Sequence, residues 1–336
     1  MKGNYKMRLK KITAACFIAL GMMLSMTACG NKNNTENNAS PAPTGVVATD
    51  NANADAETSA FPITLTDATG TDITITQEPQ RIVSLSPNAT EIICALGLED
   101  KLVGRTSYCN YPEGVADITD IGSSMDMNVE AIANLNPDLA VASVYIDENV
   151  LNQLRGMNIP VVFLDEEESF SGTYATIVKI GRLTGTNDQA NEILRSMQER
   201  VGELRGKIEQ AKQGKEDVVV YYTNQVGDSD FGAGGDTFIG EIIELAGGVN
   251  MAKDVSGWAI SKELITEKDP DIIFVPSNRD MITQMQNDDF YKNLTAVKEG
   301  KVYEVDEDII SRQGPRVVEG ISEMAVKINP DLNLSE

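Results

Sequence analysis

The sequence of 336 residues contains no histidine, and this absence removes several chemistries at once. A Ser-His-Asp triad, a histidine-based zinc site and histidine-ligated haem are all excluded. A Walker-type phosphate loop is missing too, because Gly232-Ala-Gly-Gly235 is not followed by the required lysine. That glycine run instead predicts a turn before a helix that carries Glu241. We therefore expect a protein that is not an enzyme and has no resident cofactor or metal.

Positive charge is scarce, since 28 Lys and Arg residues face 51 Asp and Glu residues, for a net charge of −23. This balance argues against binding nucleic acid or an anionic lipid surface and suits contact with a basic partner. In so acidic a chain, pairs of carboxylates carry little information. We interpret the acidic run at residues 165–168 as a solvated loop, with a low-affinity Ca²⁺ site as the alternative.

Cysteine is also sparse, with four in the chain, so no disulfide scaffold is implied. Cys16 and Cys29 belong to the N-terminal segment. Cys94 and Cys109 leave two possibilities open. They form one disulfide closing a short loop, worth about 3 kcal/mol by the loop-entropy model, or they are free thiols, with Cys94 a small core residue of a helix.

The first 28 residues have the pattern of a secretory signal peptide, with five cations, no acid and an apolar run from about residue 12 to 26. The run is shorter than the roughly 20 apolar residues of a membrane span. Its end, Leu24-Ser-Met-Thr-Ala-Cys29, resembles a bacterial lipobox, which makes Cys29 the lipidated first residue. Residues 29–60 are rich in Asn, Ala, Thr and Pro and predict a disordered tether. The alternative is an ordinary signal peptide with an incidental cysteine.

The remaining residues alternate between strand and helix patterns. Residues 63–76 predict a β-hairpin, and residues 81–85 predict a short buried strand. Asn88-Ala-Thr-Glu91 matches a capping box at the start of a helix that ends near Gly97. Further strands are predicted around residues 141–142 and 161–164. This α/β alternation predicts parallel sheets.

Two short patterns recur in the same order. Glu91-Ile-Ile93 with Gly97 returns 150 residues later as Glu241-Ile-Ile243 with Gly247. Asn128-Val-Glu130 followed by Pro137-Asp-Leu139 returns as Ser261-Lys-Glu263 followed by Pro270-Asp-Ile272. The repeat predicts two similar α/β lobes, at residues 61–186 and 213–336.

One long helix is predicted between the lobes, at residues 187–212, because its apolar residues follow helical spacing and it contains no proline. Such a helix is about 39 Å long. A rigid connection of this kind permits small rocking of the lobes rather than wide hinge closure. The apolar positions are Ile193, Leu194, Met197, Val201, Leu204 and Ile208.

These strings resemble the periplasmic-binding-protein family that serves cobalamin, ferric-siderophore and haem ABC importers. The resemblance spans residues 61–334. It implies two α/β lobes, a ligand cleft between them, and delivery of a small-molecule metal chelate to a permease and ATPase complex. It also implies an extracytoplasmic, membrane-anchored monomer. The strings that carry it are Arg81-Ile-Val-Ser-Leu-Ser-Pro-Asn-Ala-Thr-Glu91, Ser107-Tyr-Cys-Asn-Tyr-Pro112, Asn128-Val-Glu130, Asn136-Pro-Asp-Leu139, the segment from Trp258 to Glu263, and Arg312-Gln-Gly-Pro-Arg316.

The cobalamin-binding branch of the family is the most similar, and it implies a set of ligand-binding residues. Tyr108 and Trp258 correspond to aromatic cleft residues of the two lobes, and Phe231 and Arg312 to further cleft positions. The sequence departs at Ser124, where that branch can carry Trp, so Met125 or Met127 is expected to fill part of the space. Aromatic faces suit a large, flat, partly apolar chelate.

Other roles remain open for several of these residues. Tyr108 is alternatively a core tyrosine, and Arg312 a surface or capping arginine, while Arg316 is interpreted as structural. A ferric siderophore or haem is the alternative cargo, although few cleft cations other than Arg105 and Arg312 are available for an anionic chelate. An enzyme or adhesion module on the same scaffold is the remaining alternative.

Glu130 and Glu263 form a pair, each two residues after a predicted helix cap. In the family, acids at such positions dock into arginines of the permease, and Asp126 is a candidate to assist. The alternative is that each acid only stabilises its own helix N-terminus, by about 0.3–1 kcal/mol.

Overall fold

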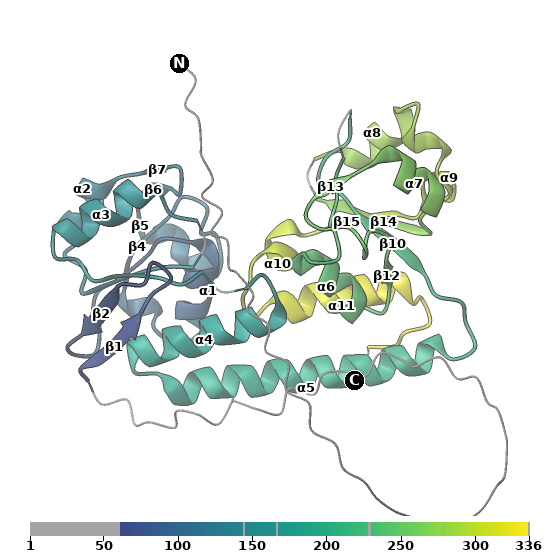
Figure 1. Cartoon of the computed structure of the whole chain (residues 1–336). Helices are drawn as coiled ribbons and strands as arrows, with labels where there is room; N and C mark the ends of the chain where they lie inside the picture. The colour runs from purple at the N-terminus through teal and green to yellow at the C-terminus, as the bar shows by residue number, and fades with distance from the viewer. Residues whose placement is uncertain (1–60, 144, 166, 228–229, 278, 335–336) are drawn as a thin grey trace, which may run out of the picture. The chain divides into compact units, whose positions relative to one another are not determined.

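Two parallel sheets organise the chain, as the computed structural model shows for residues 61–143, 145–165, 167–227, 230–277 and 279–334 (Figure 1). All of these residues belong to one compact unit. The first sheet has the order β5-β4-β3-β8-β9 and the second β12-β10-β14-β15, with every neighbouring pair parallel. The predicted α/β class with two parallel sheets is therefore confirmed. The strands are β3 (Ile82–Ser84), β4 (Leu102–Arg105), β5 (Thr119–Asp120), β8 (Leu139–Ala142) and β9 (Val161–Phe163), then β10 (Val219–Tyr222), β12 (Val249–Asn250), β14 (Ile272–Pro276) and β15 (Val302–Val305).

In the described part of the chain, three two-stranded antiparallel ribbons accompany the sheets. The predicted hairpin is confirmed as β1 (Ile63–Thr66) and β2 (Asp72–Ile75), whose alternate residues are buried. The other two ribbons are β6 (Gly122–Ser123) with β7 (Asp126–Met127), and β11 (Asp230–Phe231) with β13 (Ala259–Ile260).

Helices flank each sheet and define two lobes. The N-lobe combines the first sheet with α1 (Pro87–Ala95), α2 (Val129–Asn134), α3 (Glu148–Gly156) and α4 (Phe170–Thr184). The C-lobe combines the second sheet with α6 (Phe238–Leu245), α7 (Lys262–Lys268), α8 (Met281–Asn287), α9 (Thr295–Lys298), α10 (Glu307–Ser311) and α11 (Val317–Ile328). Short 3₁₀ helices lie at Glu99–Lys101, Glu113–Asp117 and Tyr291–Asn293.

The repeated sequence pattern falls on equivalent elements of the two lobes. Helices α1 and α6 are followed by Gly97 and Gly247, whose φ angles of 79° and 86° lie in the left-handed region that favours glycine. Helix α2 precedes β8, which pairs with β3, and helix α7 precedes β14, which pairs with β10. Strands β3 and β10 are the first strands of their sheets in chain order. The pattern therefore marks a structural repeat.

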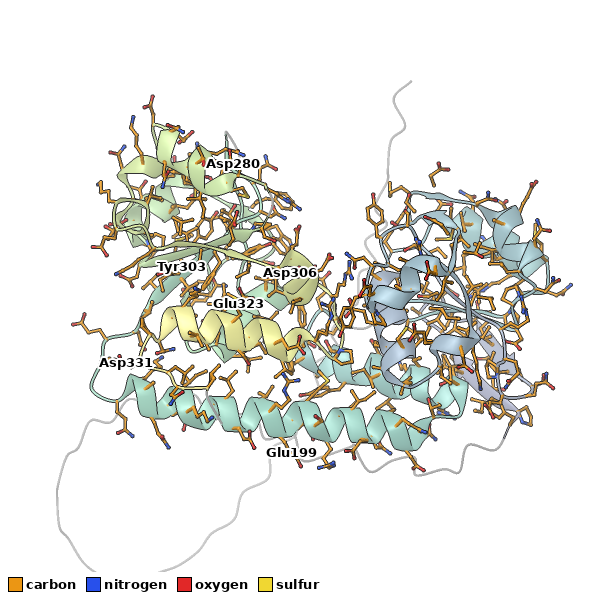
Figure 2. All side chains as sticks on the ribbon, turned by 180° about the vertical axis from the view of Figure 1, so that it is seen from behind. Glu199, Asp280, Tyr303, Asp306, Glu323 and Asp331 are labelled. Atoms are coloured by element: carbon orange, nitrogen blue, oxygen red, sulfur yellow. The ribbon has the colours of Figure 1, made fainter. Side chains whose placement is uncertain are left out.

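Helix α5 (Asn187–Lys212) leads from the N-lobe to the C-lobe and has the bounds predicted for it. Ala190, Met197, Leu204 and Ile208 are buried along one side. The exposed side carries ion pairs, among them Arg195 with Glu199, and Figure 2 shows Glu199 on the side of α5 that points away from α11. Helix α5 thus packs through an amphipathic face.

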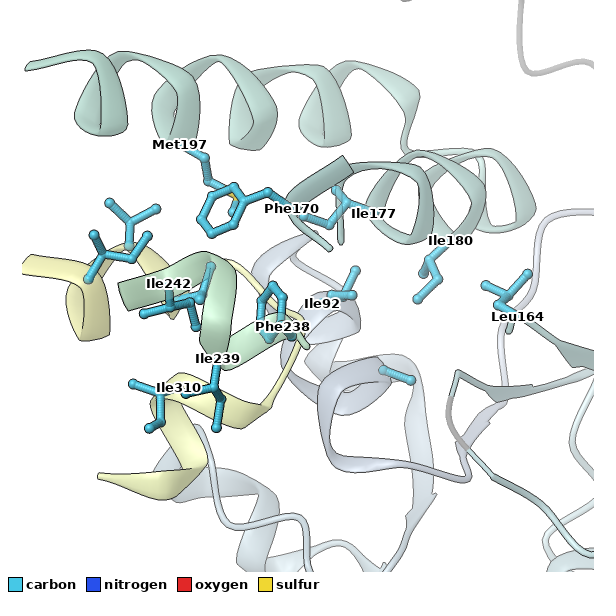
Figure 3. Packing of buried hydrophobic residues seen from close by; sticks show 14 of the residues in the cluster. Ile92, Leu164, Phe170, Ile177, Ile180, Met197, Phe238, Ile239, Ile242 and Ile310 are labelled. Atoms are coloured by element: carbon cyan, nitrogen blue, oxygen red, sulfur yellow. The ribbon is translucent and has the colours of Figure 1, made fainter. Parts of the chain in front are cut away.

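A continuous apolar core includes residues of both lobes and of α5 (Figure 3). Phe170 of α4 contacts Phe238 of α6, with ring centroids 6.1 Å apart. Ile92 of α1 and Met197 of α5 belong to the same cluster. Burying each such side chain stabilises the fold by about 1.5–3 kcal/mol. Separating the two lobes at this shared core would therefore be energetically unfavourable. Two further clusters lie within single lobes, one in each.

The predicted capping box at Asn88 is wrong. Helix α1 begins at Pro87, and the N-cap residue is Ser86, which makes no side-chain capping bond. Asn88 lies inside the first turn, where its Oδ1 accepts a hydrogen bond from the Ser143 hydroxyl at 2.9 Å. Proline suits the first helical position because its missing N–H would have no helical partner there. Glu91 is therefore free to bind elsewhere.

The two alternatives for the cysteines are resolved in favour of free thiols. Cys94 is half-buried, and Cys109 is buried. The Cys109 sulfur accepts a hydrogen bond from the Thr90 hydroxyl at 3.0 Å and lies 3.1 Å from the hydroxyl oxygen of Thr106. These contacts tie the loop after β4 to α1.

Several predictions concern residues that the structure does not describe. The signal peptide, Cys29 and the tether lie outside the described residues, and Glu166 of the acidic run does too. Asp165, Glu167 and Glu168 are exposed. Within the described ranges, no cluster of three metal-ligating side chains occurs, and no helix is long and apolar enough to span a bilayer.

Candidate functional site

The carboxyl end of the N-lobe sheet carries a small polar network. Strand β3 runs into Ser86, whose hydroxyl lies 3.0 Å from that of Ser143, just after β8. The Ser143 hydroxyl in turn bonds Asn88. Ligands of parallel α/β sheets bind at the carboxyl ends of the strands, so this edge is a suitable place for a site.

The loop after β4 presents Tyr108 at the same edge. Its neighbour Cys109 is buried and accepts a hydrogen bond from Thr90, whereas Tyr108 is 63% exposed. Tyr111 follows, and the Arg316 guanidinium of the C-lobe lies 3.8 Å from the centre of its ring. The loop therefore holds Tyr111 against the C-lobe and leaves Tyr108 exposed to solvent.

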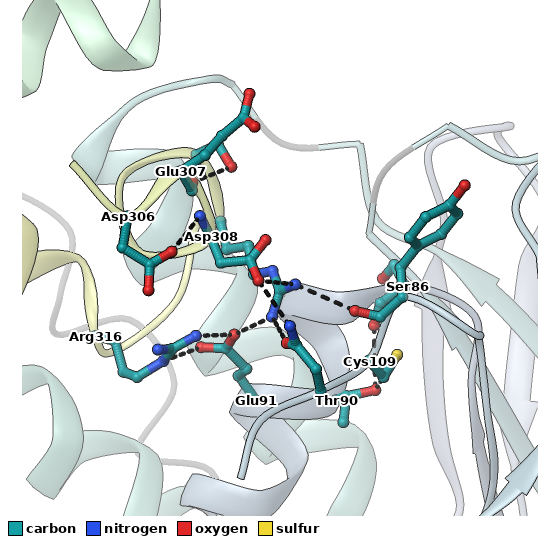
Figure 4. Close-up of polar contacts among 12 residues, drawn as sticks. Ser86, Thr90, Glu91, Cys109, Asp306, Glu307, Asp308 and Arg316 are labelled. Atoms are coloured by element: carbon teal, nitrogen blue, oxygen red, sulfur yellow. Dashed lines mark hydrogen bonds and ion pairs between the residues drawn. The ribbon is translucent and has the colours of Figure 1, made fainter. Parts of the chain in front are cut away.

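Arg312, directly after α10, reaches across to Glu91 of the N-lobe. Figure 4 shows Glu91 next to Arg316 and Asp308 of the C-lobe. Its Nη1 donates to Glu91 Oε1 at 2.8 Å and to Asn110 Oδ1 at 2.7 Å. Its Nη2 donates to the Tyr108 carbonyl at 3.1 Å and pairs with Asp308 Oδ2 at 2.8 Å. The guanidinium thus joins α10 to α1 and to the tyrosine loop.

Glu91 is the centre of this polar group. Besides Arg312, it receives two hydrogen bonds from Arg316, at 2.8 Å from Nε and 2.6 Å from Nη2. The side chain of Glu91 is only 2% exposed. Burial tends to lower the pKa of Arg316, but the hydrogen bonds to Glu91 and its negative charge outweigh burial and raise that pKa. We call Glu91, Asn110, Asp308, Arg312 and Arg316 the Arg312 cluster.

A hollow of about 310 Å³ opens beside the Arg312 cluster, with walls from both lobes. A larger hollow of about 590 Å³ lies near the end of α1, but its lining residues all belong to the N-lobe and include none of the predicted ligand-binding residues. The hollow between the lobes is therefore the candidate site. Its lining residues are Pro87, Asn88, Tyr108, Asp308, Ser311, Arg312 and Gln313.

An aromatic pair lies on the ribbon of β11 and β13 in the C-lobe. Phe231 and Trp258 stack with ring centroids 6.1 Å apart and planes 14° from parallel. Trp258 also makes an edge contact with Tyr222, at 6.4 Å. Phe231 remains 46% exposed. The pair therefore presents an apolar face while its other side is packed.

Asp230, the other residue of β11, is buried and accepts hydrogen bonds from the hydroxyls of Tyr221 and Tyr291. Burial raises the pKa of Asp230, although the two tyrosine hydroxyls oppose the shift. Its second carboxylate oxygen has no hydrogen-bond partner among the residues that the structure describes. Asp230 thus anchors the strand that carries Phe231.

The structure brings the predicted ligand-binding residues together only in part. Tyr108 and Arg312 line the hollow, and Phe231 contacts Trp258. Ser124 and Met125 lie in the turn between β6 and β7, outside the lining of the hollow, and Met125 is 82% exposed. The ligand-binding roles of all six stay predictions.

Several lining residues were not singled out from the sequence. The sequence predicts a capping role for Asn88 and gives no pattern that marks Asp308 or Gln313, although Gln313 lies within the string Arg312-Gln-Gly-Pro-Arg316. The proximity of this string to the string containing Asn88 was detectable only through the resemblance, because more than 200 residues separate them.

Glu130 and Glu263 occupy matching positions on α2 and α7. Asn128 and Ser261 cap these helices as predicted, accepting hydrogen bonds from Ala131 N at 2.9 Å and Leu264 N at 3.2 Å. Both glutamates are exposed in the first turn. Their proposed docking role stays a prediction.

Known proteins that are similar in sequence to this chain are binding proteins. Residues 82–309 match the family described as periplasmic binding protein. The uncharacterized ABC transporter substrate-binding lipoprotein YvrC of Bacillus subtilis is 35% identical, over 82% of this chain and 88% of the relative. A cobalamin-binding protein of Halobacterium salinarum is 32% identical, over 79% and 73%.

Solved structures share the fold. A possible iron-binding periplasmic solute-binding protein of Staphylococcus epidermidis has a TM-score of 0.66 at 29% identity, covering 75% of this chain and 99% of that one. A periplasmic haem-binding protein of Pseudomonas aeruginosa has a TM-score of 0.70 at 22% identity, covering 76% and 95%.

Proposed function

Because this chain belongs to the family of periplasmic binding proteins, we propose that it captures a corrinoid outside the cytoplasm and delivers it to the permease of an ABC importer. The hollow between the lobes is the observation that carries the proposal. It combines an exposed tyrosine with amide and hydroxyl side chains, namely Asn88, Ser311 and Gln313. A corrinoid offers both an apolar face and many amide groups to such a surface.

The hollow is small for a whole macrocyclic chelate. A volume of about 310 Å³ is at the lower end for small-molecule sites. The cargo is therefore proposed to extend beyond it onto the exposed face of Phe231 and the stacked Trp258. Ser124 and Met125, on the turn of the N-lobe, are proposed as further contacts at the rim.

The charge of the hollow favours a corrinoid over an anionic chelate. Arg312 is the cation in its lining, and it is paired with both Glu91 and Asp308. Arg105 bonds Asp120 and three backbone carbonyls of its own lobe. A catecholate siderophore needs several unpaired cations, which the described lining does not offer.

Haem is the second candidate cargo, and the exposure of Tyr108 favours it. A tyrosine oxygen is a known haem ligand, and Tyr108 is 63% exposed at the hollow. The haem-binding proteins among the solved structures agree with this alternative only at the level of the fold.

Delivery is proposed to depend on Glu130 and Glu263, which would pair with arginines of the permease. Replacing both with Gln should abolish uptake of the cargo by cells while leaving its affinity in solution unchanged. Glu148→Gln is the matched control, because Glu148 is an exposed acid in the first turn of α3. A loss of solution affinity in the double variant would contradict the docking role.

Membrane attachment is proposed to occur through a lipid on Cys29. The Cys29→Ala variant should move from the membrane fraction to the soluble fraction of cells, since a diacylated cysteine is the proposed anchor. If the wild type and Cys29→Ala were recovered equally in the membrane fraction, lipid attachment at Cys29 would be contradicted.

Calorimetric titration of the purified protein with cyanocobalamin, haemin and a ferric catecholate siderophore tests the cargo. We expect saturable one-to-one binding of cyanocobalamin that weakens in Tyr108→Ala and not in Met157→Ala, which removes an exposed residue at the end of α3. If haemin binds and cyanocobalamin does not, haem replaces the corrinoid as the proposed cargo.

A further inference from the structure

The hydrogen-bonding capacity of Arg312 is almost fully used by the protein itself. A guanidinium has five N–H donors, of which four are on Nη1 and Nη2. Those two atoms make four protein contacts, with Glu91, Asn110, Tyr108 and Asp308. A ligand anion could therefore form a forked pair with Arg312 only by displacing one of these partners.

The charges within the Arg312 cluster also cancel. Arg312 and Arg316 carry two positive charges, and Glu91 and Asp308 carry two negative ones. The side chains of Arg312 and Arg316 are 10% and 14% exposed, and that of Glu91 is 2% exposed. Asp308, at 40%, is the accessible member and lines the hollow. An incoming ligand therefore meets a neutral group rather than a free cation.

We infer that Glu91 and Asp308 set the charge selectivity of the hollow, so that it accepts ligands whose contacting groups are uncharged and rejects those that present a carboxylate or phosphate to Arg312. The inference rests on the proposed function in one respect, that the hollow is where cargo binds. A ligand carboxylate must compete with the Asp308 carboxylate for Nη2 and is repelled by it. Amide groups bring no such repulsion.

A purely structural role for the cluster makes a different prediction. If Glu91 and Asp308 only hold the lobes together, removing a charge changes affinity for neutral and anionic ligands by the same factor. If they set selectivity, the ratio of the two affinities changes. Haemin and haemin dimethyl ester form a suitable pair of probes, since they share one macrocycle and differ in two carboxylates.

The decisive variant is Asp308→Asn. Its side-chain oxygen can still accept from Asn110 Nδ2, which is 2.8 Å from Asp308 Oδ2, while the negative charge is lost. Glu304→Gln on β15 is the control, because it removes one exposed negative charge from the same lobe, away from the lining of the hollow. Glu91→Gln is a second variant with a larger expected effect, to be used after its circular dichroism shows a folded chain.

In Asp308→Asn, we expect the affinity for haemin relative to its dimethyl ester to rise about tenfold over the wild type, as fits one charge-assisted hydrogen bond. The gain should shrink at 1 M salt, because screening weakens the new attraction. Glu304→Gln should leave the ratio unchanged. A ratio that stays within twofold of the wild type in Asp308→Asn at low salt overturns the inference.

A second probe separates this inference from the proposed function. Inorganic phosphate is titrated into ¹⁵N-labelled protein while the Nε signal of Arg312 is followed by NMR. Asp308→Asn should show saturable binding at millimolar phosphate, and the wild type and Glu304→Gln should show none. If neither macrocycle nor cyanocobalamin binds any of the proteins, the proposed function fails while this titration still decides the inference. Equal phosphate binding by the wild type and Asp308→Asn overturns it.

Discussion

Glu91 and Glu241, which occupy equivalent places in the repeated sequence pattern, both reach across to the opposite lobe. Glu91 on α1 receives Arg312 and Arg316 of the C-lobe. Glu241 on α6 accepts a hydrogen bond at 2.8 Å from the backbone N–H of Phe170, the first residue of α4 in the N-lobe. One glutamate reaches from the N-lobe to the C-lobe, and the other reaches from the C-lobe to the N-lobe. Their partners differ in charge, since Glu91 binds two cations and Glu241 binds a neutral N–H.

Substituting these two glutamates should therefore have unequal effects on stability. Glu91→Gln leaves Arg312 and Arg316 without their shared counter-charge in a nearly buried setting, which costs about 3–5 kcal/mol. Glu241→Gln keeps an oxygen for the Phe170 N–H and should change the free energy of unfolding by no more than about 1 kcal/mol. Urea unfolding at pH 7 measures both. A larger loss in Glu241→Gln than in Glu91→Gln would contradict this assignment.

Two buried aspartates should respond to pH in opposite directions. Burial tends to raise the pKa of Asp67, but hydrogen bonds from the Thr69 hydroxyl and the N–H groups of Phe163, Thr71 and Thr69 outweigh it and lower that pKa. Asp67 therefore stabilises the fold above its unfolded pKa of about 3.8, and this contribution is lost as the pH falls through its lower folded pKa.

For Asp230, burial raises the pKa in the folded state. Its contribution is present below the unfolded value and is lost as the pH rises through the folded pKa. The stability difference between wild type and Asp67→Asn should therefore grow from pH 3 to pH 7, and that between wild type and Asp230→Asn should shrink. Urea midpoints at intervals of half a pH unit measure this, and slopes of the same sign for the two variants would refute it.

The two described cysteines should react slowly with alkylating reagents in the folded protein. Burial, with a smaller effect from Glu99, raises the pKa of Cys94 to about 12, so little thiolate is present at pH 8. Cys109 is buried against Thr90. Iodoacetamide labelling read by peptide mass spectrometry should modify both only after unfolding. Rapid labelling of Cys94 at pH 8, or recovery of a Cys94–Cys109 disulfide-linked peptide, would contradict this.

Local patterns in the sequence predicted the elements with regular periodicity. The hairpin at Ile63–Ile75, the caps at Asn128 and Ser261 and the bounds of α5 follow from spacing and capping residues within a few positions of each other. Such features depend on neighbours in the chain, so one sequence suffices to find them.

The failures arose where distant contacts compete with local ones. Glu91 matched a capping box, yet two arginines more than 200 residues away offer it a stronger, charge-assisted partner. The ligand contact of Arg312 stays a prediction, but its four protein contacts could not be inferred from the sequence, because their partners are also distant in the chain or not apparent from local spacing. The resemblance to a known family placed these strings in one cleft, but it did not reveal that the charges there cancel.

Fluorescence of Trp258, the only tryptophan in the chain, tests the central claim most directly. The purified protein is titrated with cyanocobalamin, and N-acetyltryptophanamide at equal absorbance corrects for light absorbed by the ligand. A corrinoid held between Tyr108 and the Phe231–Trp258 pair should quench the emission saturably at one ligand per protein, and Tyr108→Ala should shift the curve to higher concentration. Emission that follows the free amide at every concentration, in a protein that still binds haemin or a ferric siderophore, would contradict the corrinoid assignment.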